Sequence, residues 1–251
     1  PCGTPPRLGP AVDDGAYGEA AEAILNAKRV VVKVGGGARL AGPELETFLE
    51  LADAMAVTSP LVSGVIPVNH PRNMTVGGSK GSLSGNYAME EAELLVAVGT
   101  RAVCQSDCSR TGYPKVKQVI NINADLEAAL HYNHTIALVG DAALTLDRLN
   151  AILRKFPRKV RPESAWFKAC KAKRAEWNAF KEERYRAPRL HDPVWGGEVL
   201  TQPAVIKAVT EWARQKNAVC FFDAGDVQAN GFQIVEDEKP GQTFTETGAS
   251  Y

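Results

Sequence analysis

Apolar and polar residues follow two different periods along the first part of the chain. Over residues 17–25 the apolar side chains return every three or four positions behind Asp13 and Asp14, which predicts a helix capped by an aspartate. The next segment, Val30–Val34, is a short β-branched run that ends in three glycines. Such a run is typical of a strand buried on both faces.

The same alternation of helical and strand patterns continues to about residue 153. Pro43 precedes a second helical pattern that runs to Met55, and proline at the start of a helix is favourable. Further strands are predicted at 56–59, 94–98, 119–123 and 136–139, and further helices at 86–92 and 142–153. Strands that alternate with helices predict an α/β fold with a parallel sheet flanked by helices.

The composition changes after residue 160. Lysine, arginine, glutamate and aromatic residues dominate residues 161–189, which predicts an amphipathic helix packed on the sheet. A new helical pattern at 205–212 then leads into the apolar strand Val219–Phe222. We therefore expect a linker at 1–14, a central nucleotide-fold domain at 15–157, a helical connector at 158–198 and the beginning of a second α/β domain at 199–251.

Charge and composition narrow the function. Lysine plus arginine and aspartate plus glutamate number 29 each among 251 residues, so no net charge attracts nucleic acid or an anionic membrane. The longest apolar runs are far shorter than the roughly 20 residues that span a bilayer. Five scattered cysteines favour a reducing compartment, hence a cytoplasmic protein. The Pro/Gly-rich start has no signal-peptide pattern and is interpreted as a linker from a longer chain.

Glycines occur where predicted strands end. Gly35–Gly37 follows a strand and precedes a helix, a position where a phosphate or flavin can approach the backbone, although a tight turn explains it equally well. The spacing is not that of a nicotinamide-binding fingerprint, which disfavours a dehydrogenase. The segment Gly77–Ser82 differs from a phosphate loop because Gly81 follows Lys80, and no apolar strand is predicted to lead into it. Asp223–Asp226 follows another strand and has the same ambiguity.

Metal-ligating residues give weak patterns. Cys104 and Cys108 are close in sequence but lack the further ligands that a zinc site needs. His131 and His134 have the spacing of ligands on one helix face, without an obvious carboxylate partner. We expect no metal site in this chain.

Taken in order, several motifs resemble the acetolactate synthase and pyruvate oxidase-like family of thiamine-diphosphate enzymes. The opening Ala-Lys-Arg-Val run through the glycines covers residues 27–38, and Gly64–Pro71 is similar to the Gly-x-Pro and His-Pro stretch of that family. Residues 78–86 resemble its Gly-x-x-Gly-Ser/Thr-x-x-Ala-Asn motif, with Gly85 in place of alanine. The most specific match is Glu-Leu-Leu-Val-Ala-Val-Gly-Thr-Arg at residues 93–101.

The resemblance continues towards the end of the chain. Residues 120–128 are similar to the family's Ile-x-Ile-x-x-Asp-x-x-Glu strand, and residues 139–141 to its closing Gly-Asp. Asp223–Gln228 resembles the Asp-x-Gly-x-x-Gln segment at which the backbone approaches the cofactor diphosphate, and residues 247–251 resemble a glycine-rich segment near the aminopyrimidine ring. Val227 and the pair Ser79-Lys80 stand where acetolactate synthases have His and Met-His.

This resemblance implies a Rossmann-like middle domain and the cofactors of the family. The parent enzyme would use thiamine diphosphate and Mg²⁺, and its central domain would hold FAD, ADP or nothing. The implied cofactor-binding residues are Gly35, Gly36, Gly37, Gly78, Gly81, Gly99, Thr100, Arg101, Asp125, Asp141, Gly225, Asp226, Gln228 and Gly248. Helix caps or turns would explain several of them without a ligand.

The resemblance also implies a substrate class. The parent would act on a small-molecule 2-oxo acid or diketone, as a decarboxylase or carboligase, or as a cyclic diketone hydrolase, and would form a homodimer or homotetramer. The family's activating glutamate and its magnesium motif have no counterpart in this sequence, so we expect no catalytic residue here and no activity from this chain alone. The alternative from another class is a non-catalytic nucleotide-binding or interaction module.

Overall fold

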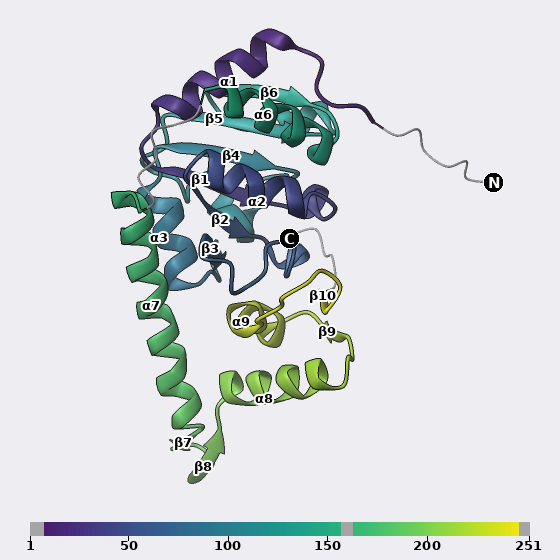
Figure 1. Ribbon diagram of the computed structural model, residues 1–251. Helices are drawn as coiled ribbons and strands as arrows, with labels where there is room; N and C mark the ends of the chain where they lie inside the picture. Colours follow the sequence, from purple (N-terminus) through teal and green to yellow (C-terminus); the bar gives the residue numbers. More distant parts are fainter. Residues whose placement is uncertain (1–7, 157–162, 246–251) are drawn as a thin grey trace, which may run out of the picture.

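The computed structural model describes residues 8–156 and 163–245. Its larger part is a parallel six-stranded sheet with the order β3-β2-β1-β4-β5-β6. The strands are β1 (Val30–Val34), β2 (Ala54–Thr58), β3 (Asn73–Val76), β4 (Leu94–Val98), β5 (Gln118–Asn123) and β6 (Thr135–Val139) (Figure 1). The predicted α/β fold with a parallel sheet is confirmed.

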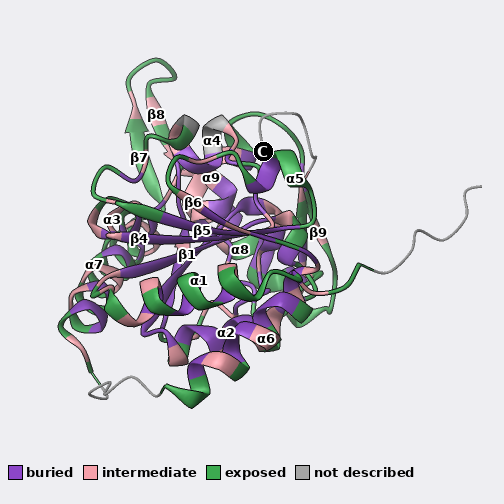
Figure 2. Cartoon of the chain, turned by 90° about the horizontal axis from the view of Figure 1, so that it is seen from above, coloured by how far each residue is buried: buried purple, intermediate pink, exposed green. Residues whose placement is uncertain are grey.

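Helices cover both faces of this sheet, and the strands between them are largely buried (Figure 2). One face carries α1 (Asp14–Asn26), α2 (Gly42–Leu51) and α6 (Ala142–Lys155); the other carries α3 (Leu83–Glu91) and the first part of α7 (Ala165–Arg186). Short segments at the strand ends are η1 (Gly36–Ala38), η2 (Pro60–Val62), α4 (Cys104–Asp107), η3 (Cys108–Arg110) and α5 (Leu126–Ala129).

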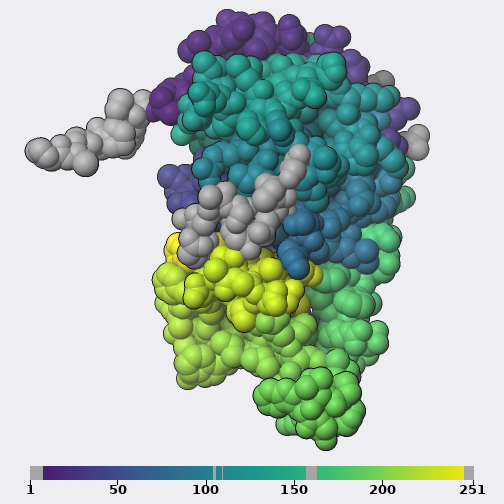
Figure 3. Space-filling model, turned by 180° about the vertical axis from the view of Figure 1, so that it is seen from behind, coloured from purple at the N-terminus to yellow at the C-terminus, as the bar shows by residue number. Residues whose placement is uncertain are grey.

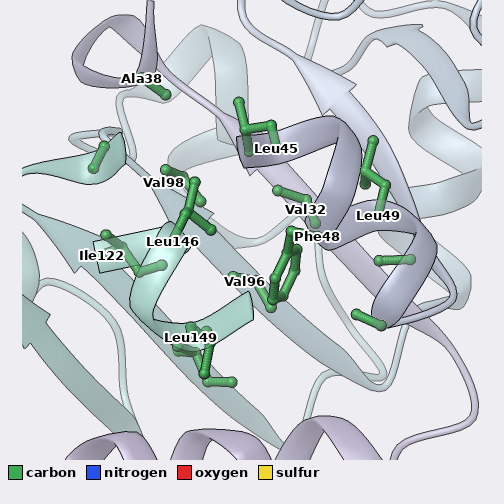
Figure 4. Close-up of a cluster of buried hydrophobic side chains, with 14 of the residues drawn as sticks. Val32, Ala38, Leu45, Phe48, Leu49, Val96, Val98, Ile122, Leu146 and Leu149 are labelled. Atoms are coloured by element: carbon green, nitrogen blue, oxygen red, sulfur yellow. The ribbon is translucent and has the colours of Figure 1, made fainter. Parts of the chain in front are cut away.

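The larger core lies between the sheet and helices α2 and α6 (Figure 4). Phe48 of α2 lies beside Leu146 and Leu149 of α6 above the central strands, Leu49 belongs to the same cluster, and all four are fully buried. Burial of each such side chain contributes about 1.5–3 kcal/mol. Because alternate residues of a strand face opposite sides, this packing fixes which face every residue of β1 takes.

Helix starts agree with the local sequence. The Asp13 carboxylate accepts hydrogen bonds from the backbone N–H groups of Gly15 and Ala16, which confirms the predicted cap of α1. Pro43 stands in the first turn of α2, as predicted. Ahead of α1, the Gly9 carbonyl accepts from Asp141 N, and Ala11 N donates to Thr145 Oγ1. The described end of the predicted linker therefore lies against α6.

Helix α7 connects the sheet to the last part of the chain. Trp166 Nε1 donates to the Val30 carbonyl at 3.1 Å, and Cys170 is fully buried, so the first half of α7 covers the sheet. The second half runs away from the sheet (Figure 1). Helix α7 is followed by an antiparallel hairpin of β7 (Arg189–Asp192) and β8 (Gly197–Leu200), which the sequence pattern did not predict.

The remaining elements form a small second unit packed on the β3 side of the sheet (Figure 3). They are α8 (Gln202–Gln215), β9 (Cys220–Phe222), α9 (Asp226–Ile234) and β10 (Thr243–Thr245), with β9 and β10 parallel. Val76 of β3 joins Phe222, Phe232 and Ile234 in a shared cluster. Within the described residues, no helix has the length and apolarity required to cross a membrane.

One strand of the sheet was missed by the pattern. Strand β3 leads directly into Gly77, so the expectation that no strand precedes the glycine loop was wrong. Its alternating Asn-Met-Thr-Val sequence obscures it, because the polar residues bond locally: Asn73 Nδ2 donates to the Ile66 carbonyl at 2.9 Å. Phosphate-loop spacing is still absent.

Candidate functional site

The strand order reverses between β1 and β4, and six of the fourteen predicted site residues lie at this point, namely Gly35, Gly36, Gly37, Gly99, Thr100 and Arg101. The chain leaves β1 towards β2 on one side, and returns from β3 to β4 on the other side. The loops after β1 and β4 therefore meet at the carboxyl edge of the sheet, and the chain continues from them in opposite directions across the sheet. In open α/β sheets, ligands bind in the crevice at such a switch point.

The two loops at the switch point are locked backbone to backbone. Gly35 N donates to the Val98 carbonyl and Gly37 N to the Gly99 carbonyl, both at 2.9 Å. A Cβ at Gly35 would lie 2.5 Å from the Gly99 oxygen, and Gly99 has a φ of +60°. Gly35 and Gly99 are thus required by the turn itself.

Gly36, Gly37 and Arg101 at the switch point reach solvent, whereas Thr100 does not. A Cβ at Gly36 would meet only Leu61 Cδ1, at 3.5 Å, and Gly37 is exposed. Thr100 is buried, and its carbonyl accepts a hydrogen bond from Asn123 Nδ2 at 2.8 Å. Arg101 is exposed beside it. The N–H groups of Gly35 and Gly37 are used between the two loops, so the exposed Arg101 guanidinium is the group at this strand edge that suits an anion.

Asp125 and Asp141 stand at the ends of β5 and β6 and cap the following helices. Asp125 Oδ1 accepts from Ala128 N at 3.0 Å, and Asp141 Oδ1 from Leu144 N at 2.9 Å. Both have a structural reason to be aspartate. They share the sheet edge with the glycines but lie one and two strands further from β1 than β4 does.

The loop after β3 holds Gly78 and Gly81. Asn86 clamps it, because Gly78 N donates to Asn86 Oδ1 at 2.8 Å and Asn86 Nδ2 donates to the Gly78 carbonyl at 3.0 Å. A Cβ at Gly85 would lie 2.2 Å from the Val76 oxygen. Glycine in place of alanine at position 85 therefore lets α3 approach the end of β3.

The second unit carries the remaining predicted residues. Gly225 has a φ of +102° and precedes the first residue of α9, Asp226, which is exposed. Gln228 is buried, and its side-chain amide donates to Thr245 Oγ1. Gly248 lies outside the described residues. These residues form a second region: α9 contacts β3 and lies beside the Gly77–Lys80 segment.

A buried polar cluster under the sheet was not predicted. Lys33 Nζ donates to the Ser106 carbonyl at 2.7 Å and lies 3.4 Å from Asp107 Oδ1. Tyr113 and Tyr132 donate their hydroxyls to the two Asp107 oxygens at 2.9 and 2.5 Å. Burial lowers the pKa of Lys33, and the Asp107 charge opposes that shift. The signal in the sequence was a lysine inside an otherwise β-branched strand.

The two histidines considered as metal ligands do not share a helix face. His131 follows α5, and His134 has a φ of +50° immediately before β6. The helix-face interpretation of their spacing was wrong, because the chain turns at 131–134.

The fold and the two strand-end regions define a Rossmann-like α/β domain packed against a smaller α/β unit. The family described as "Thiamine pyrophosphate enzyme, central domain" matches residues 17–149, more than half of the chain. The chain belongs to this family of thiamine pyrophosphate enzymes, as the sequence motifs indicated. The match covers the whole six-stranded sheet.

Relatives of known name agree with the family. Acetolactate synthase 1, chloroplastic, of Oryza sativa subsp. japonica is 27% identical over 90% of this chain and 33% of its own length. A probable acetolactate synthase large subunit of Methanococcus aeolicus is 30% identical over 51% of this chain and 22% of its own. A 3D-(3,5/4)-trihydroxycyclohexane-1,2-dione hydrolase of Bacillus velezensis is 30% identical over 65% of this chain and 25% of its own length. The chain thus spans about a third or less of these relatives' lengths.

Proposed function

We propose that this chain is the central domain and the beginning of the cofactor domain of a longer thiamine-diphosphate-dependent enzyme that cleaves or forms a carbon–carbon bond beside a carbonyl. The family match over the sheet, and a relative aligned over 90% of this chain but only 33% of its own length, carry the proposal. The proposed boundaries are a linker at 1–14, the central domain at 15–157, a connector at 158–198 and the second domain from 199.

The N-terminus of α9 fits the diphosphate of the cofactor. Space above Gly225 is open, because a Cβ there would meet no atom within 4 Å, and the nine-residue α9 begins with the next residue. Helix N-termini stabilise phosphate groups through unpaired backbone N–H groups. When bound, thiamine diphosphate supplies a stabilised carbanion that adds to carbonyl groups. We assign Gly225, Asp226, Gln228 and Gly248 to its binding, together with Mg²⁺ held by the longer protein.

The switch point fits FAD or ADP in the central domain. Gly36 leaves the backbone accessible at the end of β1, Gly37 is exposed although its N–H bonds the Gly99 carbonyl, and Arg101 offers a guanidinium for a phosphate. Gly35 and Gly99 shape the turn, and Thr100 is held by Asn123. We also assign to this site the edge residues that border it, namely Gly78, Gly81, Asp125 and Asp141.

The relatives support two reaction types for the longer protein. The acetolactate synthases among the relatives support a 2-oxo acid substrate, with decarboxylation or carboligation. The trihydroxycyclohexanedione hydrolase supports the alternative, hydrolysis of a cyclic diketone. The other class, a non-catalytic nucleotide-binding or interaction module, lacks a reason for the cofactor-like α9 region. We expect a cytoplasmic homodimer or homotetramer.

Product analysis of the longer protein tests the proposed reaction. The protein is incubated with thiamine diphosphate, Mg²⁺ and either pyruvate or a cyclic 1,2-diketone, with the present chain as a control. Carbon dioxide with a coupled hydroxy-oxo acid supports the synthase reaction, and ring-opened acid supports the hydrolase. The chain of 251 residues alone should give neither product. Turnover of neither substrate class by the longer protein contradicts the proposal.

A further inference from the structure

We propose that the cavity at the amino-terminal edge of the sheet binds a small anion that carries a flat ring, such as an aromatic phosphate or carboxylate. This cavity of about 470 Å³ lies between the start of β5, the segment after η3 and the turn before β6. It is at the opposite end of the strands from the switch point. It is therefore separate from the proposed FAD or ADP site.

The lining of this cavity is basic. Arg110, Lys117, His131 and His134 all contribute to it and are all exposed, and no carboxylate belongs to its lining. Arg110 Nη1 donates to the His131 carbonyl at 2.9 Å, which links the two sides of the cavity. Two cations, Arg110 and Lys117, beside one concave site favour an anion.

The neighbouring carboxylates are engaged chiefly by other groups, and Glu93 attracts Lys117 only at a longer range than an ion pair. Glu93 lies beside Lys117 but accepts from the backbone N–H groups of Lys28 and Arg29, and its other oxygen lies 3.6 Å from Arg29 Nη2. Asp107 lies behind the cavity wall and pairs with Lys33. Within residues 8–156 and 163–245, neither Arg110 nor Lys117 lies within 4.0 Å of a carboxylate oxygen in an ion pair.

The back wall is aromatic and fixed. Tyr113 and Tyr132 line the cavity, and both hydroxyls donate to the one buried Asp107 carboxylate. The hydroxyls are thus directed into the protein, and the rings are held in place before a ligand arrives. Tyr113 is buried and Tyr132 is half-buried, so the held Tyr132 ring is the one that offers a surface for stacking, at little entropic cost on binding. The combination of cations and held aromatic rings selects a ring-bearing anion over a bare one.

Phenyl phosphate is a suitable probe because it has no adenine or flavin ring to occupy a nucleotide site. We would titrate it into the ¹⁵N-labelled chain and follow backbone amide shifts, with inorganic phosphate and phenol as the two halves of the ligand. We expect saturable shifts at residues 113–119 and 131–134. Each half alone should bind about tenfold or more weaker, which is the effect of losing one charged hydrogen bond or a stacked ring.

Charge-removing variants locate the site. Arg110→Gln and Lys117→Gln should each weaken phenyl phosphate binding about tenfold. Lys115→Gln is the matched control, because Lys115 lies on the same segment but pairs with Glu91 at 2.6 Å; binding should change less than twofold. All three residues are exposed, so the variants should fold normally, which their melting temperatures check. Equal binding of inorganic phosphate, unaffected binding in both variants, or no saturable shift overturns the proposal.

Discussion

Lys33 and Asp107 form an ion pair in which neither side chain reaches solvent. Lys33 Nζ lies 3.4 Å from Asp107 Oδ1, and both side chains have 0% exposure. The pair joins the central strand β1 to the segment after β4, and Asp107 also receives two tyrosine hydroxyls. A charge in this position is tolerable only while its partners are present.

Lys33→Met should therefore destabilise the fold strongly. The substitution preserves the length of the side chain but leaves the Asp107 charge buried without its cation, at a cost of about 3 kcal/mol. Urea unfolding measures the change. Lys115→Met, which removes the 50% exposed lysine of a surface pair, should cost less than about 1 kcal/mol. Equal effects of the two substitutions would show that the buried pair does not stabilise the chain.

Gly99 and Gly36 should respond differently to alanine. At Gly99 a Cβ would lie 2.6 Å from Ala38 N, and φ is +60°, so Gly99→Ala should lower the free energy of unfolding by about 2 kcal/mol or more. At Gly36 the space is open, and Gly36→Ala should change the free energy of unfolding by less than about 1 kcal/mol. Chemical denaturation of both variants measures these free energies. A larger loss of stability in Gly36→Ala than in Gly99→Ala would contradict the described packing of the two loops.

Sequence patterns predicted the sheet well where strands were continuous and apolar. β1 and β4 were found because parallel strands covered on both faces have no polar side to interrupt the run. β5, with Asn121 and Asn123 on one face, and the partly exposed edge strand β6 were found from their remaining apolar residues. β3 was missed because Asn73 and Thr75 are polar residues whose bonds are made locally. The hairpin β7–β8 was missed because its residues are mostly exposed and carry no apolar face.

The sequence predicted which loops form the candidate site, but it did not predict the contacts between them. Glycines at strand ends indicated Gly35 and Gly99, but only the three-dimensional packing shows that each is required by the other loop. The pairing of Lys33 with Asp107 joins residues 74 positions apart, and no local pattern encodes a contact at that separation. The same holds for Asn123, which holds the Thr100 carbonyl.

Glu236 should make stability depend on acid pH. Burial disfavours its charge, but Lys181 and Lys207, at 2.6 and 2.7 Å, outweigh burial and lower the pKa to about 2. A depressed pKa stabilises the folded state above the unfolded value near 4.5, and this contribution is lost as pH falls from about 4.5 to 2. Burial lowers the pKa of Lys181, so desolvation offsets part of the attraction, and the net contribution is about 2 kcal/mol.

Comparison of the chain with Glu236→Gln measures this effect. The variant should be about 2 kcal/mol less stable at pH 7, and the difference should shrink towards pH 2. Glu211→Gln is the control, because Glu211 also pairs with Lys207 but its side chain is 48% exposed. A difference that stays constant from pH 7 to pH 2 would exclude the assigned titration.

The apolar face of the second unit should be covered in the longer protein. Val209 and Trp212 of α8 are 55% and 59% exposed, and Phe221, 78% exposed, stacks on Phe244. Parallel strands with both faces apolar are typical of a sheet interior. Phe221→Gln loses the exposed stacking on Phe244 and should therefore cost the present chain about 1 kcal/mol or less, but the longer protein about 3 kcal/mol. Thermal unfolding of both proteins measures the two losses of stability. Equal losses in the present chain and in the longer protein would contradict the domain assignment.

The cofactor content of the longer protein tests the central claim most directly. The natively purified protein is denatured, and the released thiamine diphosphate is quantified per subunit, with flavin absorbance read from the same sample. We predict about one thiamine diphosphate per subunit when Mg²⁺ is present, and a large loss in Gly225→Val, whose side chain fills the space above the start of α9. No thiamine diphosphate in the unaltered protein, with Mg²⁺ and cofactor supplied, would contradict the account and favour the binding-module alternative.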